Sequence, residues 1–395
     1  MVRIILKNLT AVLRDRIAYN VTVIIENGII SEIDESNKYT NGLDCEGLYC
    51  LPGIIDTHSD ILENELLQRS NIDFPPEFIM NSIENRLLSS GITTICHGIT
   101  FEDCSFRKRS VHNAKKLVHI IDVFNETGLT QLDHIILYRL NVRSSNAITY
   151  IKDRLDYCKN NGSKIFIGIE DHAPGFGPFH EINKFRQHLV NMIGVDDDFV
   201  DTLLDDEIKK TEMYSPQKNR CELFIPEIIK HGAKILAHDC YDAEEVHNTY
   251  SIGASVAEFP LSLDAARTAK KLGMLVVAGA PNIIRGKSHS GFVSAFDLVK
   301  NRVCDILASD YMPQSLLVAA FKMYFDGELP LHVAIQLISS GPANLLGLTD
   351  RGEIKVGFRG DLILVSLNQQ IPKIIHTFTY PSFHKDFLVI NYCDK

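Results

Sequence analysis

The amino-acid sequence predicts an α/β protein: a (β/α)8 barrel of the TIM type with a small β-sandwich domain built from both termini. Two observations support this fold class. Strand-like aliphatic runs alternate with helical stretches from about residue 52 to residue 346, and both ends of the chain are rich in β-forming residues. Alternation of this length is typical of parallel strands joined by helices. We expect the barrel in residues 51–349 and a composite β domain in residues 1–50 and 350–395.

Turn and stop signals locate individual elements within this plan. Residues 21–33 carry an Asn-Gly turn between two β-rich runs, which predicts a hairpin. Residues 262–273 predict a helix that ends at a glycine, and the aliphatic residues 274–278 then predict a buried parallel strand. Residues 352–366 alternate short strands with glycine turns. We expect these C-terminal strands to pair with the N-terminal strands beside the barrel.

One strand end carries a pattern that suits a metal ion. Residues 51–57 form an apolar run that leads into His58 and Asp60. Side chains at positions i and i+2 of a strand point to the same face, so this imidazole and this carboxylate lie side by side. Divalent transition metals accept both nitrogen and oxygen ligands. A single His-x-Asp pair is more often a solvated turn than a metal site, so the assignment depends on the other strands.

The same arrangement recurs on three further strands. Apolar runs at residues 164–169, 234–237 and 305–308 each lead into a histidine or a carboxylate. Because the carboxyl ends of parallel barrel strands open onto one face, these side chains should meet there. We predict a site for one or two divalent transition-metal ions, with zinc first and manganese, iron or nickel as alternatives. Its predicted ligands are His58, Asp60, His172, His238 and Asp310.

The composition narrows the class of protein. A formal net charge of −10 argues against non-specific nucleic-acid binding, which depends on a broad basic surface. The sequence has no apolar segment near the length of about 18 residues that a transmembrane helix needs, and no GxGxxG or Walker loop. Nine cysteines without a CxxC pair indicate a reduced, cytoplasmic protein. We expect a small anionic substrate and no nucleic-acid or membrane partner; a homo-oligomer is compatible with the sequence.

Two motifs make the chain resemble the amidohydrolase superfamily of metal-dependent hydrolases. They are Pro-Gly-x-x-Asp-x-His at residues 52–58 and Gly-x-Ile-x-x-Gly-x-x-x-Asp-Leu at residues 352–362. Within the superfamily the chain is most similar to the diphosphatases of the carbon–phosphorus lyase pathway, through residues 171–175, 258–260, 279–291 and 305–311. That group hydrolyses α-D-ribose 1-methylphosphonate 5-triphosphate to the 5-phosphate and pyrophosphate. The resemblance implies this reaction, used in phosphonate metabolism, and the same five metal ligands.

The chain departs from the family pattern around the predicted site. Asn141 stands where the family has a glutamate that ligates metal, and Glu170, on the strand face of a predicted ligand, is a candidate replacement. The loop at residues 174–178 lacks an arginine of the family, and Ile61 and Cys240 replace an asparagine and an aspartate. All these changes lie near the predicted site, while the barrel motifs are intact. They favour an altered substrate preference.

The resemblance also implies how the site works. A metal ion lowers the pKa of a bound water molecule to about 7, and Asp310 is placed to accept the proton as general base. A donor-rich, glycine-bracketed loop should contact the anionic substrate through Arg285, Lys287, Ser288, His289 and Ser290. The family pattern adds four residues to the predicted substrate contacts: Arg69, Arg220, Asp239 and Glu258.

Two alternative functions remain open at this stage. The same scaffold and metal could hydrolyse a non-peptide C–N bond, in a cyclic amide or a deaminase-type substrate. A neutral amide should not need Arg285, whereas a phosphate substrate should. The chain could also be a catalytically silent paralogue, but a silent protein has no need of Asp310, and all five predicted ligands are present.

Overall fold

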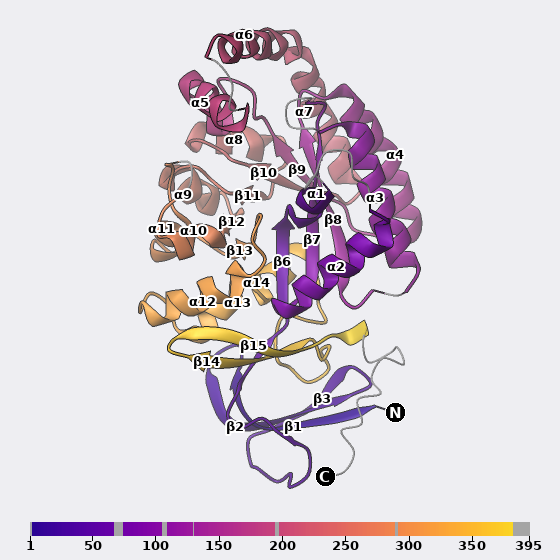
Figure 1. Cartoon of the computed structure of the whole chain (residues 1–395), viewed down its shortest axis with the longest axis vertical. Helices are drawn as coiled ribbons and strands as arrows, with labels where there is room; N and C mark the ends of the chain where they lie inside the picture. Colours follow the sequence, from indigo (N-terminus) through magenta and orange to yellow (C-terminus); the bar gives the residue numbers. More distant parts are fainter. Residues whose placement is uncertain are drawn as a thin grey trace.

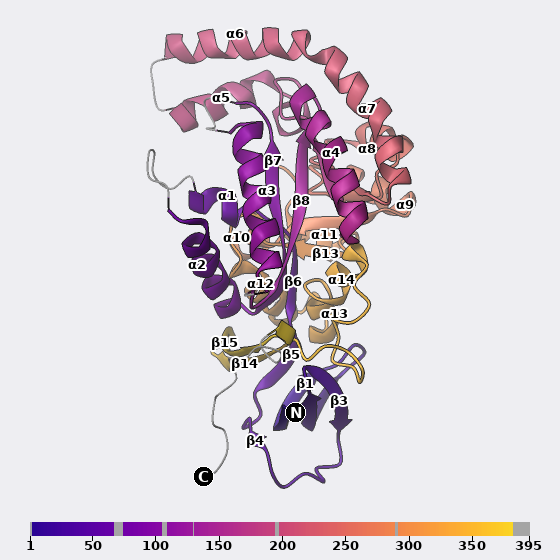
Figure 2. The same ribbon diagram turned by 90° about the vertical axis from the view of Figure 1, so that its right-hand side faces the viewer.

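The computed structural model describes residues 2–66, 74–104, 109–128, 130–193, 197–288 and 291–381. It shows a barrel with a smaller β domain at one end, seen from two sides in Figures 1 and 2. Eight parallel strands form the barrel sheet. In chain order they are β6 (Ile54–Ser59), β7 (Ile92–Phe101), β8 (Asp133–Asn141), β9 (Phe166–Glu170), β10 (Lys234–His238), β11 (Val256–Glu258), β12 (Leu275–Gly279) and β13 (Ile306–Ala308).

Helices surround the barrel strands on the outside (Figure 1). Helix α6 crosses the end of the barrel that lies far from the β domain (Figure 2). The helices are α1 (Ile61–Leu66), α2 (Pro76–Ser89), α3 (Val111–Glu126), α4 (Ser145–Asn161), the 3-10 turn η1 (Gly177–Phe179), α5 (Ile182–Ile193), α6 (Asp197–Met213), α7 (Ser215–Lys230), α8 (Ala243–Ser251), α9 (Leu263–Lys271), α10 (Ala280–Arg285), α11 (Ala295–Lys300), α12 (Ser315–Phe325), α13 (Leu331–Gln336) and α14 (Ser340–Leu346).

The first and last barrel strands meet and nearly close the barrel. A parallel bridge joins Ser59 to Asp310, just beyond the end of β13. The Asp310 amide donates to the His58 carbonyl over 2.9 Å, and the Asp60 amide donates to the Asp310 carbonyl over 2.6 Å. The predicted (β/α)8 barrel is confirmed. Its closing hydrogen bonds involve three of the predicted metal ligands, so the contacts that close the barrel also position these residues.

The terminal segments form one seven-stranded sheet. Its strands are β1 (Arg3–Val12), β2 (Ile17–Glu26), β3 (Ile29–Asp34), β4 (Leu43–Asp44), β5 (Tyr49–Pro52), β14 (Leu362–Asn368) and β15 (Ile371–Phe378). The expected pairing of the two ends is confirmed, because β14 runs antiparallel to β5. A bridge between Ile29 and Arg359 brings the segment before β14 to β3. The single sheet thereby turns back on itself and encloses an apolar core. This sheet is the composite β domain for which the sequence predicted a sandwich.

The hairpin and the helix–strand pair predicted from local signals are confirmed, whereas the alternating strands predicted over residues 352–366 reduce to turns before a single strand, β14, which begins at Leu362. Strands β2 and β3 form the hairpin, with Asn27 at φ 49° and Gly28 at φ 79° in its turn. Both values lie in the left-handed region, which the favoured two-residue hairpin turn requires. The predicted helix at residues 262–273 is α9, and the strand that follows it is β12.

Apolar side chains from successive strands fill the barrel interior below the site. They are Ile55, Cys96, Leu137, Phe166, Leu236, Val256, Val277 and Ile306. Most of them stand two to four residues before a polar residue of the site, so the polar groups lie nearer the carboxyl ends of the strands. The cysteines of the described residues are free thiols, as expected.

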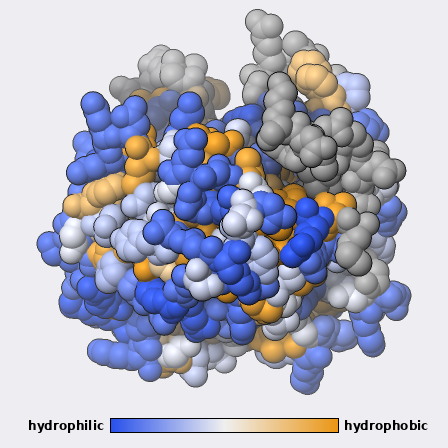
Figure 3. All heavy atoms as spheres, turned by 90° about the horizontal axis from the view of Figure 1, so that it is seen from below, coloured by the Kyte–Doolittle hydropathy of each residue, from blue (hydrophilic) through white to orange (hydrophobic). Residues whose placement is uncertain are grey.

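The outer surface is polar over the face that contains the β domain. In Figure 3 hydrophilic side chains predominate on this face, and apolar side chains occur in small separate groups. The apolar residues of the terminal strands are buried in their own core instead. Among the described helices, none is both long enough and apolar enough to span a membrane.

Candidate metal centre

Histidines and carboxylates from five strand ends meet at the carboxyl end of the barrel. Three groups of side chains bring their nitrogen and oxygen atoms within 4.8 Å of one another. The groups are His58 with His238 and Glu258, Glu170 with His172 and His238, and His58 with Asp60 and Asp310. All five ligands predicted from the strand ends are therefore brought together. Nitrogen and carboxylate donors in this mixture suit zinc and other divalent transition metals.

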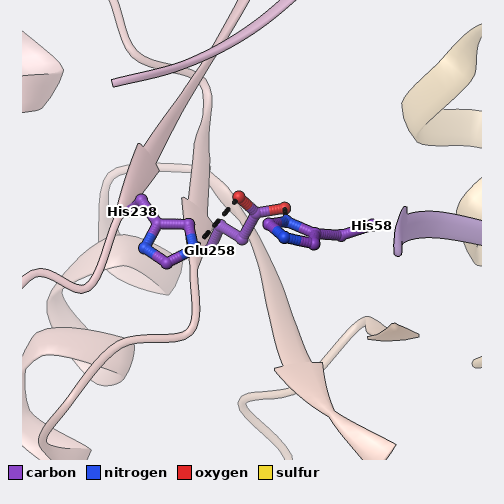
Figure 4. Close-up of side chains that lie close together, drawn as sticks. All are labelled: His58, His238 and Glu258. Carbon is purple, nitrogen blue, oxygen red and sulfur yellow. Dashed lines mark ion pairs between the residues drawn. The ribbon is translucent and has the colours of Figure 1, made fainter. Parts of the chain in front are cut away.

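Glu258 lies between two imidazoles in the most buried of these groups, as Figure 4 shows. Its Oε1 is 3.0 Å from His58 Nδ1, and its Oε2 is 3.9 Å from His238 Nε2. The polar side-chain atoms of these three residues are buried, and their contacts with neighbouring carboxylates and imidazoles are ion-pair contacts that lack good hydrogen-bond geometry. Such atoms are rare because each one costs desolvation energy. A divalent cation would satisfy them, so the residues present fit a metal ion.

Asp239 connects the two remaining histidines. Its Oδ2 is 3.0 Å from His172 Nε2 and 2.9 Å from His238 Nδ1. Burial raises the pKa of the Asp239 carboxyl, but the charge of His238 and the hydrogen bonds from both imidazoles outweigh burial and hold it well below its usual range. A carboxylate in this position fixes the orientation and tautomer of the rings that it contacts. Asp239 also faces the cavity described below, where its predicted contact with substrate stays a prediction.

Arg139 on β8 places a guanidinium inside the cluster. Its Nη1 donates to both carboxylate oxygens of Asp60, over 2.8 and 3.0 Å. Its Nε and Nη2 donate to Oε2 of Glu170, over 3.1 and 2.9 Å. Burial raises the pKa of Glu170, but the Arg139 charge opposes it and the net value falls to about 2. Arg139 therefore keeps both carboxyl groups ionised in the barrel interior.

Three residues at strand ends have left-handed backbone conformations. Asp239, Phe259 and Asp310 have φ values of 57°, 53° and 57°. Each donates its amide to a neighbouring strand, to the carbonyls of Glu258, Val277 and His58 respectively. Left-handed backbone is unfavourable for residues other than glycine and is held only where the surroundings fix it. Here the hydrogen bonds to adjacent strands fix it and direct the Asp310 side chain toward the site.

The Asp310 carboxyl group faces the cavity beside the predicted ligands. Burial and the negative charge of Asp60 raise its pKa. The preceding residue is held from below, because the Ser309 amide and hydroxyl both donate to the buried carboxyl group of Asp56, over 3.0 and 2.5 Å. Asp56 belongs to the Pro-Gly-x-x-Asp-x-His motif at residues 52–58. This motif therefore supports the segment that carries Asp310 and also contains the predicted ligand His58.

A cavity of about 840 Å³ opens above the cluster. Its floor includes Asp60, His172, His238 and Asp310. Phe259, Phe292 and Leu298 add apolar surface, and the cationic side chains on its wall are Arg109, Arg139 and Lys184. This volume lies within the range of small-molecule sites, so the cluster is accessible to a substrate of that size.

A second cavity of about 590 Å³ adjoins the first, and both share Arg109 and His172. Asn141 lies on the wall of the second cavity. Its amide nitrogen donates to Glu102 over 3.0 Å, and its amide oxygen accepts from the Arg143 backbone over 2.9 Å. Both polar atoms of the Asn141 side chain are thus engaged in hydrogen bonds, whereas Glu170, the candidate replacement, belongs to one of the three groups.

The predicted substrate contacts are only partly assembled. Ser288 lines the main cavity, but Arg285 and Lys287 are exposed and do not belong to its wall. Arg285 is the last residue of the short helix α10, and Lys287 follows its end; the same helix supplies Asn282 to the cavity. Glu258 is fully buried and does not belong to the lining of the cavity. The structure therefore does not place Arg285, Lys287 or Glu258 on the cavity wall, and their contact with substrate stays a prediction.

The other predicted contacts lie outside what the structure describes. Arg69, His289 and Ser290 fall outside the described residues, and only the backbone of Arg220 is described, within α7. Two positions that depart from the family pattern are buried: Ile61 at the start of α1, and Cys240, whose Sγ is 3.8 Å from the Thr249 hydroxyl. The Phe176 ring of the altered loop packs against the Arg143 guanidinium, 4.5 Å from it.

Sequence reasoning missed two arginines of the site, Arg139 and Arg109. The signal for Arg139 was present, because it is a charged residue inside the apolar run of residues 135–140 and lies on the same strand face as Asn141. Arg109 had no such signal. It follows β7 by eight residues and reaches the site through Glu63, which its Nη2 contacts over 3.0 Å.

Comparisons with known proteins agree with this architecture. Residues 206–388 match the amidohydrolase family. The chain is 30% identical over 363 residues to α-D-ribose 1-methylphosphonate 5-triphosphate diphosphatase from Escherichia coli strain K12. The aligned residues cover 91% of this chain and 94% of that protein.

Solved structures show the same fold at low identity. N-acetylglucosamine-6-phosphate deacetylase from Pasteurella multocida has a TM-score of 0.60 and 11% identity, with 95% of this chain and 98% of that chain covered. The ochratoxinase of A. niger has a TM-score of 0.60 and 12% identity, with 96% and 94% covered. At such identities the likeness concerns the fold alone.

Proposed function

Because this chain belongs to the amidohydrolase family, we propose that it is a metal-dependent hydrolase that cleaves a phosphoanhydride bond. The proposed substrate is α-D-ribose 1-methylphosphonate 5-triphosphate, and the products are the 5-phosphate and pyrophosphate. Similarity to the E. coli diphosphatase over 91% of the chain is the observation that carries this choice. The buried histidine–carboxylate cluster under an 840 Å³ cavity supports the metal-dependent chemistry.

The proposed roles follow from the contacts of each side chain. His58, His238 and Glu258, with Asp60, His172 and Asp310 beside them, would hold the metal. When bound, a divalent ion supplies Lewis-acid activation of water and neutralises phosphate charge. Asp310 faces the cavity and accepts the proton of the attacking water as general base. Zinc is the metal that we propose first, because the donor set mixes imidazole with carboxylate.

Two cations on the cavity wall are proposed to bind the triphosphate. Arg109 and Lys184 both line the main cavity, and an arginine fork suits phosphate oxygens. They replace Arg285 and Lys287 as the expected phosphate contacts. In the absence of substrate each is paired with a carboxylate: Arg109 with Glu63, and Lys184 with Glu181 over 3.2 Å. Substrate phosphate would compete with these carboxylates for the same donors.

These pairings favour a second candidate function, hydrolysis of a non-peptide C–N bond. If the wall cations stay neutralised by their carboxylates, the cavity suits an uncharged amide better than a triphosphate. The exposed position of Arg285 points in the same direction. Arg109→Met separates the two candidates: it should raise KM for a phosphate substrate and leave KM for a cyclic amide unchanged.

The test is pyrophosphate release from ribose 1-methylphosphonate 5-triphosphate by metal-reconstituted protein. We expect turnover, and we expect Asp310→Asn to lower kcat by at least about 100-fold, the usual contribution of a general base. Asp305→Asn is the control, because Asp305 pairs with Lys270 and lines neither cavity. Fully metallated protein that releases no pyrophosphate but opens a cyclic amide would contradict the proposal and establish the second candidate.

A further inference from the structure

We propose that Arg139 is a built-in cation that takes the place of a second metal ion, so that the centre holds one divalent ion per chain. The proposal rests on the metal-dependent function above and specifies the composition of that same site. It concerns a residue to which the proposed function gives no role: Arg139 lines the cavity and contacts the carboxylates of Asp60 and Glu170, through which we propose that it acts.

Arg139 contacts residues from two of the three groups that could hold a metal, and it leaves the third without such a contact. Its guanidinium binds both oxygens of Asp60 and one oxygen of Glu170. Asp60 and Glu170 each belong to a different one of the three groups that could hold a metal. No hydrogen bond or ion pair joins Arg139 to the third group, His58 with His238 and Glu258, in the described part of the chain. That group is free of competition from a fixed cation, so it is the one that we assign to the metal.

The barrel interior is built to accommodate this arginine. Gly98 on the adjacent strand β7 faces it, and a Cβ at that position would lie 3.2 Å from Arg139 Cδ and 2.9 Å from Asp60 Oδ1. On the other side, a Cβ at Gly168 of β9 would lie 3.8 Å from Arg139 Cγ. The side chain is 6% exposed. Arg139 therefore occupies a defined volume, in which a larger residue at position 98 would displace it.

Charge explains why the arginine excludes a second ion. A divalent cation bound to Asp60 or Glu170 would lie beside a guanidinium that is already hydrogen-bonded to the same oxygens. It would have to share or displace those hydrogen bonds, and it would meet a like charge in a region shielded from water. Asn141 reinforces the effect, because an amide at a strand end next to Glu170 offers no negative charge to offset the repulsion.

Zinc stoichiometry tests the proposal without reference to turnover. Apoprotein is titrated with zinc by calorimetry, and bound metal is counted by elemental analysis after removal of free ion. Wild-type protein should bind one zinc ion per chain. Arg139→Met should bind two, because it frees Asp60 and Glu170. Arg139→Lys should again bind one zinc ion per chain, because it keeps a fixed positive charge. It disturbs packing about as much as Arg139→Met does, so a difference between the two variants reports the charge. Cobalt(II) absorption provides a second readout and should double in amplitude for Arg139→Met.

Arg143→Met is the matched control. Arg143 lies four residues along the same chain segment and pairs with Asp171, a carboxylate outside the three groups, over 2.9 Å. This variant should keep one zinc ion. Arg139→Gln, which retains hydrogen-bonding capacity without charge, serves if Arg139→Met fails to fold.

Each outcome decides a separate point. Two zinc ions in wild-type protein would overturn the role of Arg139 while leaving the proposed metal-dependent function intact. A single ion in both neutral variants at position 139 would also overturn it. No zinc in any protein would instead contradict the proposed function.

Discussion

A buried chain of three polar side chains lies between the barrel and its helices, away from the candidate site. His97 Nε2 is 2.8 Å from His134 Nδ1, and His134 Nε2 is 3.1 Å from Glu84 Oε1. The two rings stack with centroids 5.1 Å apart. Burial, and then the neighbouring His134, hold the pKa of His97 well below 6.5. Among single residues, His97 is therefore an expected source of sensitivity to acid.

His97→Gln should make the protein less sensitive to acid. In the folded state His97 resists protonation, whereas in the unfolded chain it accepts a proton near its ordinary pKa of 6.5. The unfolded state therefore binds more protons below about pH 6.5, and the free energy of unfolding falls there by up to about 1.4 kcal/mol per pH unit. Urea unfolding of the metal-loaded protein at pH 7.5 and pH 5.5 measures this loss.

The variant should show a smaller loss than wild type over the same interval. His112→Gln on the exposed side of α3 is the control and should keep the wild-type loss. Equal losses in His97→Gln and wild type would show that another group binds the proton.

Helix α9 shows how far a single element follows from local sequence. Ser262 precedes it with extended backbone, and its hydroxyl accepts a hydrogen bond from the Ala265 amide over 3.1 Å. Gly273 follows it at φ 78°, the left-handed conformation that commonly ends a helix. Between these signals, four residues of the helix are buried, Ala265, Ala266, Thr268 and Ala269. The range of this helix and its glycine end agree with the prediction from sequence.

Ser262→Ala should lower the free energy of unfolding by about 1 kcal/mol, the usual contribution of an N-terminal cap. The loss arises because the Ala265 amide at the helix start is left without its acceptor. Thermal or urea unfolding measures it. Ser251→Ala is the control, because the Ser251 hydroxyl donates to a carbonyl near the end of α8 and caps no amide. Equal losses in the two variants would argue against a capping role.

At the scale of the whole molecule, Asp133 links the barrel to the C-terminal segment. It begins β8 at the end of the barrel next to the β domain (Figure 1). Arg351 Nη1 forms a short ion pair with its Oδ2, and Arg359 Nη1 contacts the same atom over 2.6 Å. Arg351 also reaches Thr94 on β7 over 3.2 Å. Residues more than 200 positions apart are thus joined where the two sheets meet.

Asp133→Asn should lower the free energy of unfolding by roughly 1–3 kcal/mol, as expected for hydrogen bonds to charged partners. The variant leaves two mostly buried arginines with one carboxylate fewer. Unfolding followed by circular dichroism and by zinc release should show this loss. Asp350→Asn removes an exposed partner of the same Arg351 and should cost less than about 1 kcal/mol. A larger loss in the control would contradict this assignment.

Much of the fold and half of the site were predictable, for one physical reason. Parallel barrel strands end on the same face, so a histidine or carboxylate after an apolar run is delivered to that face whatever the details of packing. This is why His58, His172, His238 and Asp310 could be identified together. Arg285 could not be placed in this way, because it ends a helix of six residues, and a small rotation of that helix decides whether its side chain faces the cavity or solvent.

The sequence by itself determined the alternation of elements, the hairpin at Asn27 and which histidines and carboxylates stand at strand ends, because these depend on local periodicity and turn chemistry. Only the tertiary structure decided that Glu258 lies between two histidines and that Arg139 joins Asp60 to Glu170. Those contacts cross between strands that are far apart in sequence. They depend on the relative heights of the strands in the closed barrel and on the space left by Gly98, neither of which has a local signature.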